Sequence, residues 1–312
     1  MITTDLDRFL ALARACAPDF GPATARAAFL VTPEGFARAE ESAQDNRYMA
    51  AAGYHAEAAL AEHRALQRAL SADVPVFAFP GDPATPDAVF PNNVFAIARP
   101  DAQVLPQAPP RLLVGRMRHA VRQAEAVRAD IRGFFRDTAG AVEIDLSQQP
   151  HPCELTGSLV IDRARGLGFC GLSERCDEAG AALMHEAFGL RATLLFDLAA
   201  GEYHTNVVLA VLAGRAVLVS PAGFAEPAVA QAIAGLYAPH AVLLERRQQA
   251  AFAANAIALS PRRVWMSAVA AASLDPARVQ ALARAGFELG QVPLAAIEAG
   301  GGSLRCCVAE VF

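Results

Sequence analysis

Hydrophobic and polar positions alternate along the chain in a recurring order that predicts two short strands, a helix and a third strand. Two apolar runs flank a turn containing Gly, Pro, Asp or Arg, which is typical of a β-hairpin. An amphipathic segment with a period near 3.6 residues follows and predicts a helix, and another short apolar run predicts a strand. The predicted hairpins span 92–105, 157–173, 206–220 and 256–269.

Each hairpin has a helix and a closing strand downstream of it. The helices are predicted at 116–135, 174–189, 226–238 and 275–286. The closing strands are predicted at 141–146, 192–198, 241–246 and 287–294. The units therefore recur about every 50–65 residues, a spacing typical of radial or solenoid arrays.

A fifth unit is divided between the two ends of the chain. The run at 303–312 predicts a hairpin strand with no partner after it. The missing parts are predicted near the N-terminus, as a strand at 27–33, a helix at 56–70 and a strand at 74–79. We therefore expect an α/β fold in which five ββαβ units close a ring around a central cavity. The predicted domains are a helical extension at 1–20 and a single domain at 21–312.

Polar side chains recur at one place in every unit, at or just before the first hairpin strand. They are Asn92, Asn93, Glu154, His204, Asn206, Asn255 and Cys306. In a ring, equivalent positions converge on the central axis. A thiol, an imidazole and a carboxylate at one cavity can activate a nucleophile, and the amides can bind a planar substrate with several N–H groups.

Each of these residues alone also has a purely structural interpretation. A cysteine in an apolar strand is most often part of the core, and adjacent strand residues point to opposite faces, so only one of Cys306 and Cys307 can face the cavity. His204 also fits a hydrogen-bonded core histidine, and Glu154 fits a turn or cap residue. Asn93 and Asn206 fit turn positions. The predicted convergence favours the functional interpretation.

Four stretches resemble the pentein superfamily of guanidino-group-modifying enzymes, which includes arginine deiminase, dimethylarginine dimethylaminohydrolase, arginine dihydrolases and amidinotransferases. They are "PDAVFPNN" at 86–93, "ELTGSLVIDR" at 154–163, "YHTNVVLAV" at 203–211 and "GGGSLRCCVAEVF" at 300–312. The similarity covers roughly residues 27–312 in the same order, and it is strongest to bacterial arginine-deiminase-related proteins and citrulline hydrolases. The resemblance implies a pentein fold, also called an α/β propeller.

The resemblance also implies a role for individual residues. Cys306 matches the nucleophile, His204 the general acid/base, and Glu154 the carboxylate that binds the guanidinium. Cys307 becomes an outward-facing neighbour. The residues implied to bind substrate are Asn93, Asn206, Asn46 in "DNRYM", and Asp87. For the far end of the substrate, Arg122 or Arg118 is a candidate to bind an α-carboxylate, although each also fits a solvated helix arginine.

Two aspartates of the deiminase pattern are asparagines in this chain, at positions 93 and 206. A carboxylate pairs with a cationic guanidinium through charge-assisted bonds, whereas an amide offers one acceptor and one donor group. The donor suits the oxygen of a neutral ureido group. We therefore expect a preference for ureido substrates, or a guanidino substrate processed through a ureido stage. "CELTG" also replaces the more usual Glu-Gly-Gly-Asp.

Composition argues against nucleic-acid binding, membrane binding and secretion. The net charge of −5 provides no basic surface for nucleic acid or for an anionic membrane. No apolar run is long enough to span a bilayer and no secretory signal is visible, so we expect a cytoplasmic protein with six free thiols. "HPCE" and "HEAFG" each lack the partner residues of a zinc motif, so no metal or other cofactor is expected.

Three hypotheses for function follow. The first is a cysteine hydrolase that cleaves a C–N bond of an arginine derivative or citrulline through a covalent Cys306 intermediate, releasing ammonia or an amine such as ornithine. The second is an amidinotransferase with the same site, and the third is a ring that binds without catalysis. The expected partner is a small molecule, and the sequence leaves a monomer or a homodimer open.

Overall fold

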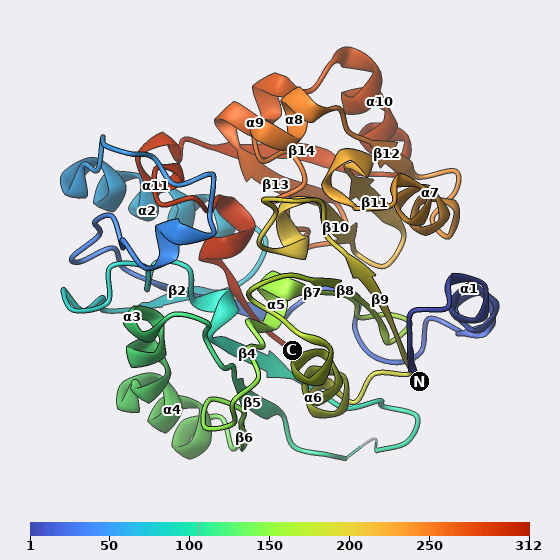
Figure 1. Cartoon of the computed structure of the whole chain (residues 1–312), viewed down its shortest axis with the longest axis horizontal. Coiled ribbons are helices and arrows are strands. Elements are labelled where there is room, and N and C mark those ends of the chain that lie inside the picture. Colours follow the sequence, from blue (N-terminus) through green and yellow to red (C-terminus); the bar gives the residue numbers. More distant parts are fainter. Residues whose placement is uncertain (106) are drawn as a thin grey trace.

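The predicted strand–strand–helix–strand order is found in the computed structural model, which describes residues 1–105 and 107–312. The strands form four sheets, and helices connect the parallel strands within them. Figure 1 shows α2, α4, α7 and α10 at the periphery of the molecule and β4, β7, β10 and β13 nearer its middle. The chain therefore has an α/β fold, as expected.

The second unit forms a sheet of four strands. β7 (Leu159–Asp162) pairs antiparallel with β8 (Leu167–Leu172), which pairs parallel with β9 (Ala192–Asp197). The connection is α6 (Glu178–Phe188), where Asp177 caps the first turn and the left-handed Gly189 ends the helix. The helix therefore lies between two turn signals that the sequence carries.

The third and fourth units form smaller sheets. β10 (Leu209–Leu212) pairs antiparallel with β11 (Ala216–Val219), which is parallel to β12 (Ala241–Leu243) after α7 (Pro227–Gly235). In the fourth unit, β13 (Arg263–Ser267) is parallel to β14 (Glu288–Val292). Its helices are α8 (Arg246–Ala250), α9 (Ala268–Ser273) and α10 (Pro276–Arg284).

The hairpin predicted at 256–269 is wrong in part. Its first arm makes one antiparallel bridge, between Ile257 and Trp265, instead of a regular strand. Pro261 and Arg262 precede β13, and Pro261 has no backbone N–H to donate to a ladder. Only the second arm is therefore a strand.

The first and fifth units share one six-stranded sheet with the order β3-β2-β15-β4-β5-β6. β4 (Phe95–Ala98), β5 (Arg111–Val114) and β6 (Val142–Asp145) form the first unit. β15 (Ala309–Val311) pairs antiparallel with β2 (Ala27–Val31), and β2 is parallel to β3 (Val76–Phe79) after α2 (Ala56–Leu70). The predicted pairing of the last strand with the N-terminal strands is confirmed.

The long helix predicted at 116–135 is broken into pieces. It contains α3 (Ala120–Gln123), a 3₁₀ turn at 124–127, α4 (Ala129–Gly133) and a π-helical turn at 134–138. Arg128 has ψ near 97°, which ends one piece and starts the next. Its guanidinium donates to the Pro80 carbonyl and to Asp130 in this conformation.

The N-terminal residues form part of a sheet and of the core. β1 (Ile2–Thr3) adds a parallel strand to β9, and α1 (Leu6–Ala15) is capped by Asp5. Phe9 and Ala13 on this helix are fully buried. A helix therefore occupies part of the segment predicted as an extension, and the boundary between 1–20 and 21–312 stays a prediction.

Short one-turn helices precede the inner strands. They are η2 (Pro91–Asn93), α5 (Leu155–Ser158), η5 (Thr205–Val207) and η7 (Leu304–Cys307). Cys306 and Cys307 lie in η7, so their expected position within a strand is wrong. Proline at position 91 and glycine at 157 suit such turns better than a ladder. These turns contain Asn92, Asn93, Asn206 and Cys306, and Glu154 and His204 directly precede two of them.

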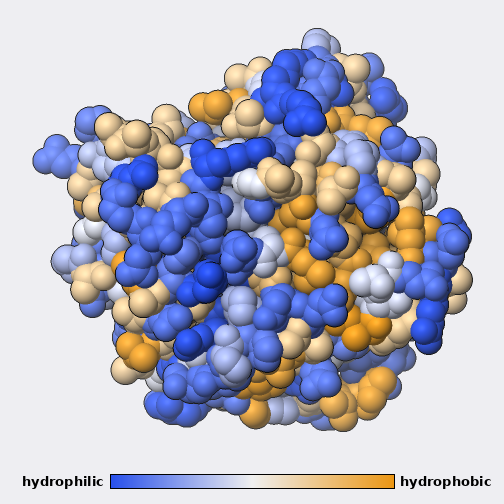
Figure 2. All heavy atoms as spheres, viewed as in Figure 1, coloured by the Kyte–Doolittle hydropathy of each residue, from blue (hydrophilic) through white to orange (hydrophobic). Residues whose placement is uncertain are grey.

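Buried apolar residues pack between each helix and its sheet. The inner face of α2 buries Ala59, Leu66 and Leu70, for example. Figure 2 shows that hydrophilic side chains gather over α2 and α3, whereas hydrophobic side chains gather between β10 and α1. No helix within the described ranges is long and apolar enough to cross a bilayer.

Candidate active site

A cavity of about 260 Å³, including its open mouth, lies beside the one-turn helices. Its walls contain five of the residues proposed from the sequence, which are Asn46, Asp87, Asn93, Arg122 and Cys306. Ser42, Met49, Phe90, Arg175, Tyr203 and two glycines complete the wall. The cavity therefore brings together residues from distant parts of the chain, whereas Glu154, His204 and Asn206 are not among the residues that line it.

Cys306 places its sulfur among amide groups. Asn255 Nδ2 donates to Cys306 Sγ over 3.2 Å, and the Cys306 thiol donates to Asn206 Oδ1 over 3.7 Å. Burial raises the pKa of the Cys306 thiol, against the hydrogen bonds that lower it. The resting side chain is therefore a neutral thiol that needs a further positive charge or a base to ionise.

Asn255 holds the nucleophile turn through both ends of its amide. Its Oδ1 accepts the Cys306 backbone N–H over 3.3 Å, and its Nδ2 also donates to the Asn206 carbonyl over 3.0 Å. The side chain is fully buried. Sequence analysis placed Asn255 at the recurring position without assigning it to the site, although "FAAN" occupies the same place as "FPNN".

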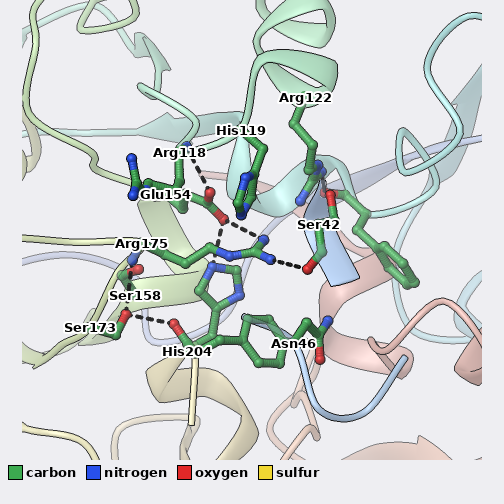
Figure 3. Close-up of polar contacts among 12 residues, drawn as sticks. Ser42, Asn46, Arg118, His119, Arg122, Glu154, Ser158, Ser173, Arg175 and His204 are labelled. Atoms are coloured by element: carbon green, nitrogen blue, oxygen red, sulfur yellow. Dashed lines mark hydrogen bonds and ion pairs between the residues drawn. The ribbon is translucent and has the colours of Figure 1, made fainter. Parts of the chain in front are cut away.

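His204 and Glu154 form a buried pair. His204 Nε2 lies 2.8 Å from Glu154 Oε2, and both side chains are fully buried (Figure 3). Burial lowers the pKa of His204, and Glu154 opposes that shift. Since an ionised carboxylate only accepts hydrogen bonds, neutral His204 carries its proton on Nε2, and Nδ1 keeps the free lone pair.

Glu154 accepts hydrogen bonds at both oxygens. The Arg118 backbone N–H donates to Oε1 over 3.0 Å, and Arg175 reaches Oε2 over 3.4 Å. Burial alone would raise the pKa of Glu154, but the Arg175 charge and the His204 hydrogen bond lower it overall. Glu154 is therefore a carboxylate that orients His204 and leaves few sites free for a substrate.

Arg175 is a buried member of the site that sequence reasoning missed. It joins Glu154 to Asp45, whose carboxylate lies 2.6 Å from Arg175 Nη2. Nη2 also donates to the Ser42 carbonyl, and Figure 3 shows Arg175 between Glu154 and Ser42. His119 Nε2 reaches the same Asp45 carboxylate over 3.1 Å. In "LSERCD" the arginine lies between acidic neighbours, a pattern that suggests a solvated surface charge.

Asp87 and Arg122 occupy the wall next to Arg175. Asp87 Oδ2 accepts from the Ser42 hydroxyl over 2.6 Å, and burial raises the pKa of Asp87. Arg122 pairs with Glu125 and donates to the Asp87 and Phe90 carbonyls. Burial raises the pKa of Glu125 to about 7, with Arg122 opposing.

Asn46 and the glycines at 300–302 form another part of the wall. Asn46 Nδ2 donates to the Gly301 carbonyl over 3.2 Å, and the Tyr203 hydroxyl donates to the same carbonyl. Gly301 has a φ of +76°, and a Cβ there would lie 2.4 Å from Asn46 Nδ2. Glycine is therefore required at this position for both the backbone angle and the close approach.

The structure separates the two arginines proposed for the far end of a substrate. Arg122 is buried in the cavity wall. The Arg118 guanidinium pairs with Glu174, and both side chains are at least half exposed. Arg118 therefore contributes to the site only through the backbone N–H that binds Glu154.

Several polar atoms at the site have no hydrogen-bond partner within the described part of the chain. They include Asp87 Oδ1, Asn92 Oδ1, Asn93 Oδ1, Ser158 Oγ and His204 Nδ1. Buried polar atoms are almost always paired, so a cluster of unpaired ones indicates a place that a ligand or water completes. Because four of the five are carbonyl-type oxygens or a ring nitrogen, the cluster favours a ligand rich in N–H groups.

Throughout residues 1–105 and 107–312, no group of three or more His, Cys, Asp or Glu side chains is placed to hold a metal ion. The six cysteines are free thiols.

Comparison with known proteins identifies relatives of this chain. The family model for N,N dimethylarginine dimethylhydrolase, eukaryotic, matches residues 32–312. No curated protein sequence matches.

Three solved structures show the breadth of the fold similarity. The N-terminal domain of ArgZ, an arginine dihydrolase from cyanobacteria, gives a TM-score of 0.77 at 18% identity over 91% of this chain and 97% of that one. AgrE in complex with L-arginine gives 0.75 at 18% identity over 92% and 40% of the two chains. A dimethylarginine dimethylaminohydrolase variant with an S-methyl-L-thiocitrulline adduct gives 0.66 at 18% identity over 92% and 99%.

Proposed function

Because the chain belongs to the N,N-dimethylarginine dimethylhydrolase family, within the pentein superfamily of guanidino-modifying enzymes, we propose that it is a cysteine-dependent hydrolase of a guanidino or ureido C–N bond. The observation that carries this proposal is that two residues lining the cavity with Cys306 carry unpaired acceptors, Asp87 Oδ1 and Asn93 Oδ1. A third unpaired acceptor, His204 Nδ1, lies beside Asn93 Oδ1 against Gly157. Asp87 Oδ1, Asn93 Oδ1 and His204 Nδ1 are positioned to accept N–H groups, which guanidino and ureido groups carry on every nitrogen.

Cys306 is the proposed nucleophile. Its sulfur attacks the central carbon of the substrate and forms a C–S bond, and the thiol proton leaves toward a base. A cationic substrate next to the sulfur favours the thiolate, which offsets the raised pKa that burial causes in the free protein. Asn255 Nδ2 then donates to the developing thiolate.

His204 is the proposed acid and base. Its Nδ1 is free, and its Nε2 is held by Glu154, so one ring nitrogen can exchange a proton while the other stays fixed. His204 protonates the departing nitrogen when the C–N bond breaks. It then takes a proton from water, whose oxygen attacks the carbon, and breaking the C–S bond regenerates the Cys306 thiol.

The substrate's polar groups have candidate partners on the opposite wall. Asp87 provides an unpaired carboxylate oxygen for an amine, and Arg122 and Arg175 provide positive charge for a carboxylate. Asn93 and Asn206 replace the carboxylates that would favour a cation, so we propose an amino acid with a ureido group, or a guanidino group processed through a ureido stage. ArgZ and the dimethylarginine dimethylaminohydrolase structures are named for reactions of this chemical class.

We also propose that the five units close a ring. Two observations support closure: β15 pairs in parallel with β4, which joins the fifth unit to the first, and one cavity is lined by β7, β10, residues 256–258 and Glu310 of β15. Segments of four units therefore line one space.

Turnover assays with matched cysteine variants test the proposed reaction. The protein is incubated with arginine, methylated arginines, N-acylarginines and citrulline without any amine acceptor, and ammonia, methylamines, citrulline and ornithine are measured. We expect product without an acceptor, which amidino transfer would not give. Cys306→Ala should abolish turnover, whereas Cys307→Ala should retain it because Cys307 packs in the core. Full turnover by Cys306→Ala would refute the mechanism.

A further inference from the structure

Arg163 is a buried cation outside the proposed active site. It follows β7 directly and begins the turn to β8, and only 8% of it is exposed. Among the described residues, its side chain makes no hydrogen bond and no ion pair. Its guanidinium carbon instead lies 5.0 Å from the ring centroid of Phe188 and 4.4 Å from that of Phe312.

This environment leaves the charge of Arg163 incompletely compensated. Aromatic faces attract a cation but provide no acceptor atoms for its five N–H donors. Burial lowers the pKa of Arg163 to about 10, Glu310 opposes that shift and Arg305 adds to it. A buried guanidinium without acceptors is unfavourable unless water or a ligand supplies them.

Arg163 lines the cavity that the inner strands of several units enclose. This cavity has a volume of about 550 Å³, including its mouth, and it shares no lining residue with the cavity that contains Cys306. Asn206 and Thr156 lie at its wall, and so do Arg305 and Glu310. Because Arg305 Nη2 already pairs with Glu310 over 2.9 Å, Arg163 contributes a net positive charge to this space.

We propose that this second cavity binds a small carboxylate at the Arg163 guanidinium. Two N–H groups along one edge of a guanidinium match the two oxygens of a carboxylate in a bidentate pair. Phe188 and Phe312 occupy space over the guanidinium, which favours a planar group that approaches its edge over a tetrahedral anion such as sulfate. The ligand class is therefore a monocarboxylate or a small dicarboxylate, bound in a cavity whose wall includes Asn206, the residue that accepts from the Cys306 thiol.

Ligand-dependent thermal stability and calorimetry of the full chain test this site. Acetate and succinate are titrated at constant ionic strength, with chloride and sulfate as comparison anions. We expect saturable stabilisation by the carboxylates, at least about tenfold weaker in Arg163→Gln because a hydrogen bond to a charged group is lost. Arg246→Gln is the matched control, since Arg246 is exposed on α8 and has the same charge.

The outcomes separate the proposed site from other anion effects. Equal binding by Arg163→Gln and the unmodified protein, or equal stabilisation by sulfate and acetate, would overturn the proposal. If Arg163→Gln does not fold by circular dichroism, Arg163→Lys replaces it; that variant keeps the charge but loses the bidentate edge, so it should bind carboxylates more weakly. Cys306→Ala should bind carboxylates normally, which makes this result independent of the proposed reaction.

Discussion

At the scale of single residues, the hydrogen bonds of Cys306 explain how a buried thiol can still become a nucleophile. The sulfur has one donor nearby, Asn255 Nδ2, and one acceptor, Asn206 Oδ1. The acceptor favours the neutral thiol, and the donor favours the thiolate. Asn255 therefore positions the turn and also opposes the effect of burial on the thiol.

Asn255→Asp tests that role, because it keeps the shape of the side chain while replacing the donor with a negative charge. The pKa of Cys306 should rise further, and alkylation of the thiol at neutral pH should slow about tenfold or more, since hydrogen bonds to charged groups contribute about 1.5–3 kcal/mol. The measurement is the pH dependence of iodoacetamide labelling at Cys306, read by mass spectrometry. Unchanged labelling in Asn255→Asp, with Cys307→Ala as the control for label position, would contradict this role.

Sequence reasoning reached the polar residues that recur once per unit, because repetition marks them. Arg175 and Asp45 lie outside the recurring position, and Arg175 pairs with both Asp45 and Glu154, which joins segments far apart in the chain. Nothing in the local pattern distinguishes them from solvated charges. Ion pairs of this kind depend on tertiary packing, which a single sequence does not specify.

At the scale of elements, one-turn helices, and not strands, carry Asn93 and Cys306, two of the side chains that line the cavity. In η7, Cys306 lines the cavity and its neighbour Cys307 packs against the core. The expected difference between the two cysteines is therefore present, although a turn and not a strand produces it. Sequence patterns predicted the strands that follow but not the turns, because three or four residues carry too little periodicity. The same limit explains the broken helix at 116–135, where the amphipathic pattern continues through the irregular Arg128.

Gly157 in α5 packs directly against the side chains of Asn93 and His204. A Cβ there would lie 2.5 Å from Asn93 Oδ1 and 2.7 Å from His204 Cε1. Gly157→Ala should therefore displace both side chains and reduce kcat about a hundredfold, because misplacement of about 1 Å has effects of this size. Overpacking should also lower the free energy of unfolding by about 1–3 kcal/mol.

Gly235→Ala is the matched control for that change. Gly235 lies at the end of α7, and an added Cβ would meet no atom within 4 Å. It should leave kcat unchanged and stabilise the protein by up to about 1 kcal/mol. Steady-state kinetics and chemical denaturation of both variants check the pair, and equal kcat values for the two would contradict the packing explanation.

At the scale of the whole molecule, buried histidines make stability depend on pH. Burial lowers the pKa of His63 to about 4, from an ordinary value near 6.5, and neither of its ring nitrogens has a partner among the described residues. Between pH 6.5 and pH 4, His63 is protonated in the unfolded chain but stays neutral in the folded chain. Stability is therefore retained above pH 6.5 and decreases as the pH falls toward 4.

His63→Leu should flatten that decrease. The depressed pKa corresponds to about 3 kcal/mol for this one group by pH 4, at 1.36 kcal/mol per pKa unit. Denaturant unfolding at pH 7.5 and pH 5 measures the difference in free energy, and His55→Gln is the control because His55 is exposed at the start of α2. A pH dependence in His63→Leu as steep as in the unmodified protein would show that other groups cause it.

The order of elements could be predicted from the sequence because most of the units repeat it, whereas the closed ring of five units stays a proposal. The chain ends supplied the strongest evidence, since the predicted last strand had no partner after it and β15 pairs with β2 at 27–31. The division into four separate sheets was not predictable, because it depends on whether edge strands of neighbouring units pair, as β15 and β4 do.

The position of β15 inside the largest sheet also affects how the two walls of the cavity exchange hydrogen with solvent. The turn that contains Cys306, η7, leads directly into a strand with a neighbour on each side, β2 and β4. Another part of the wall, with Ser42, Asn46 and Met49, comes from residues 32–55, where only the single turn at Ser42–Gln44 is helical. In deuterated water, peptides containing Cys306 should therefore label late, by cooperative opening, and peptides containing Asn46 early, by local fluctuation. Solvent and product would then pass on the Asn46 side while the sulfur remains in place.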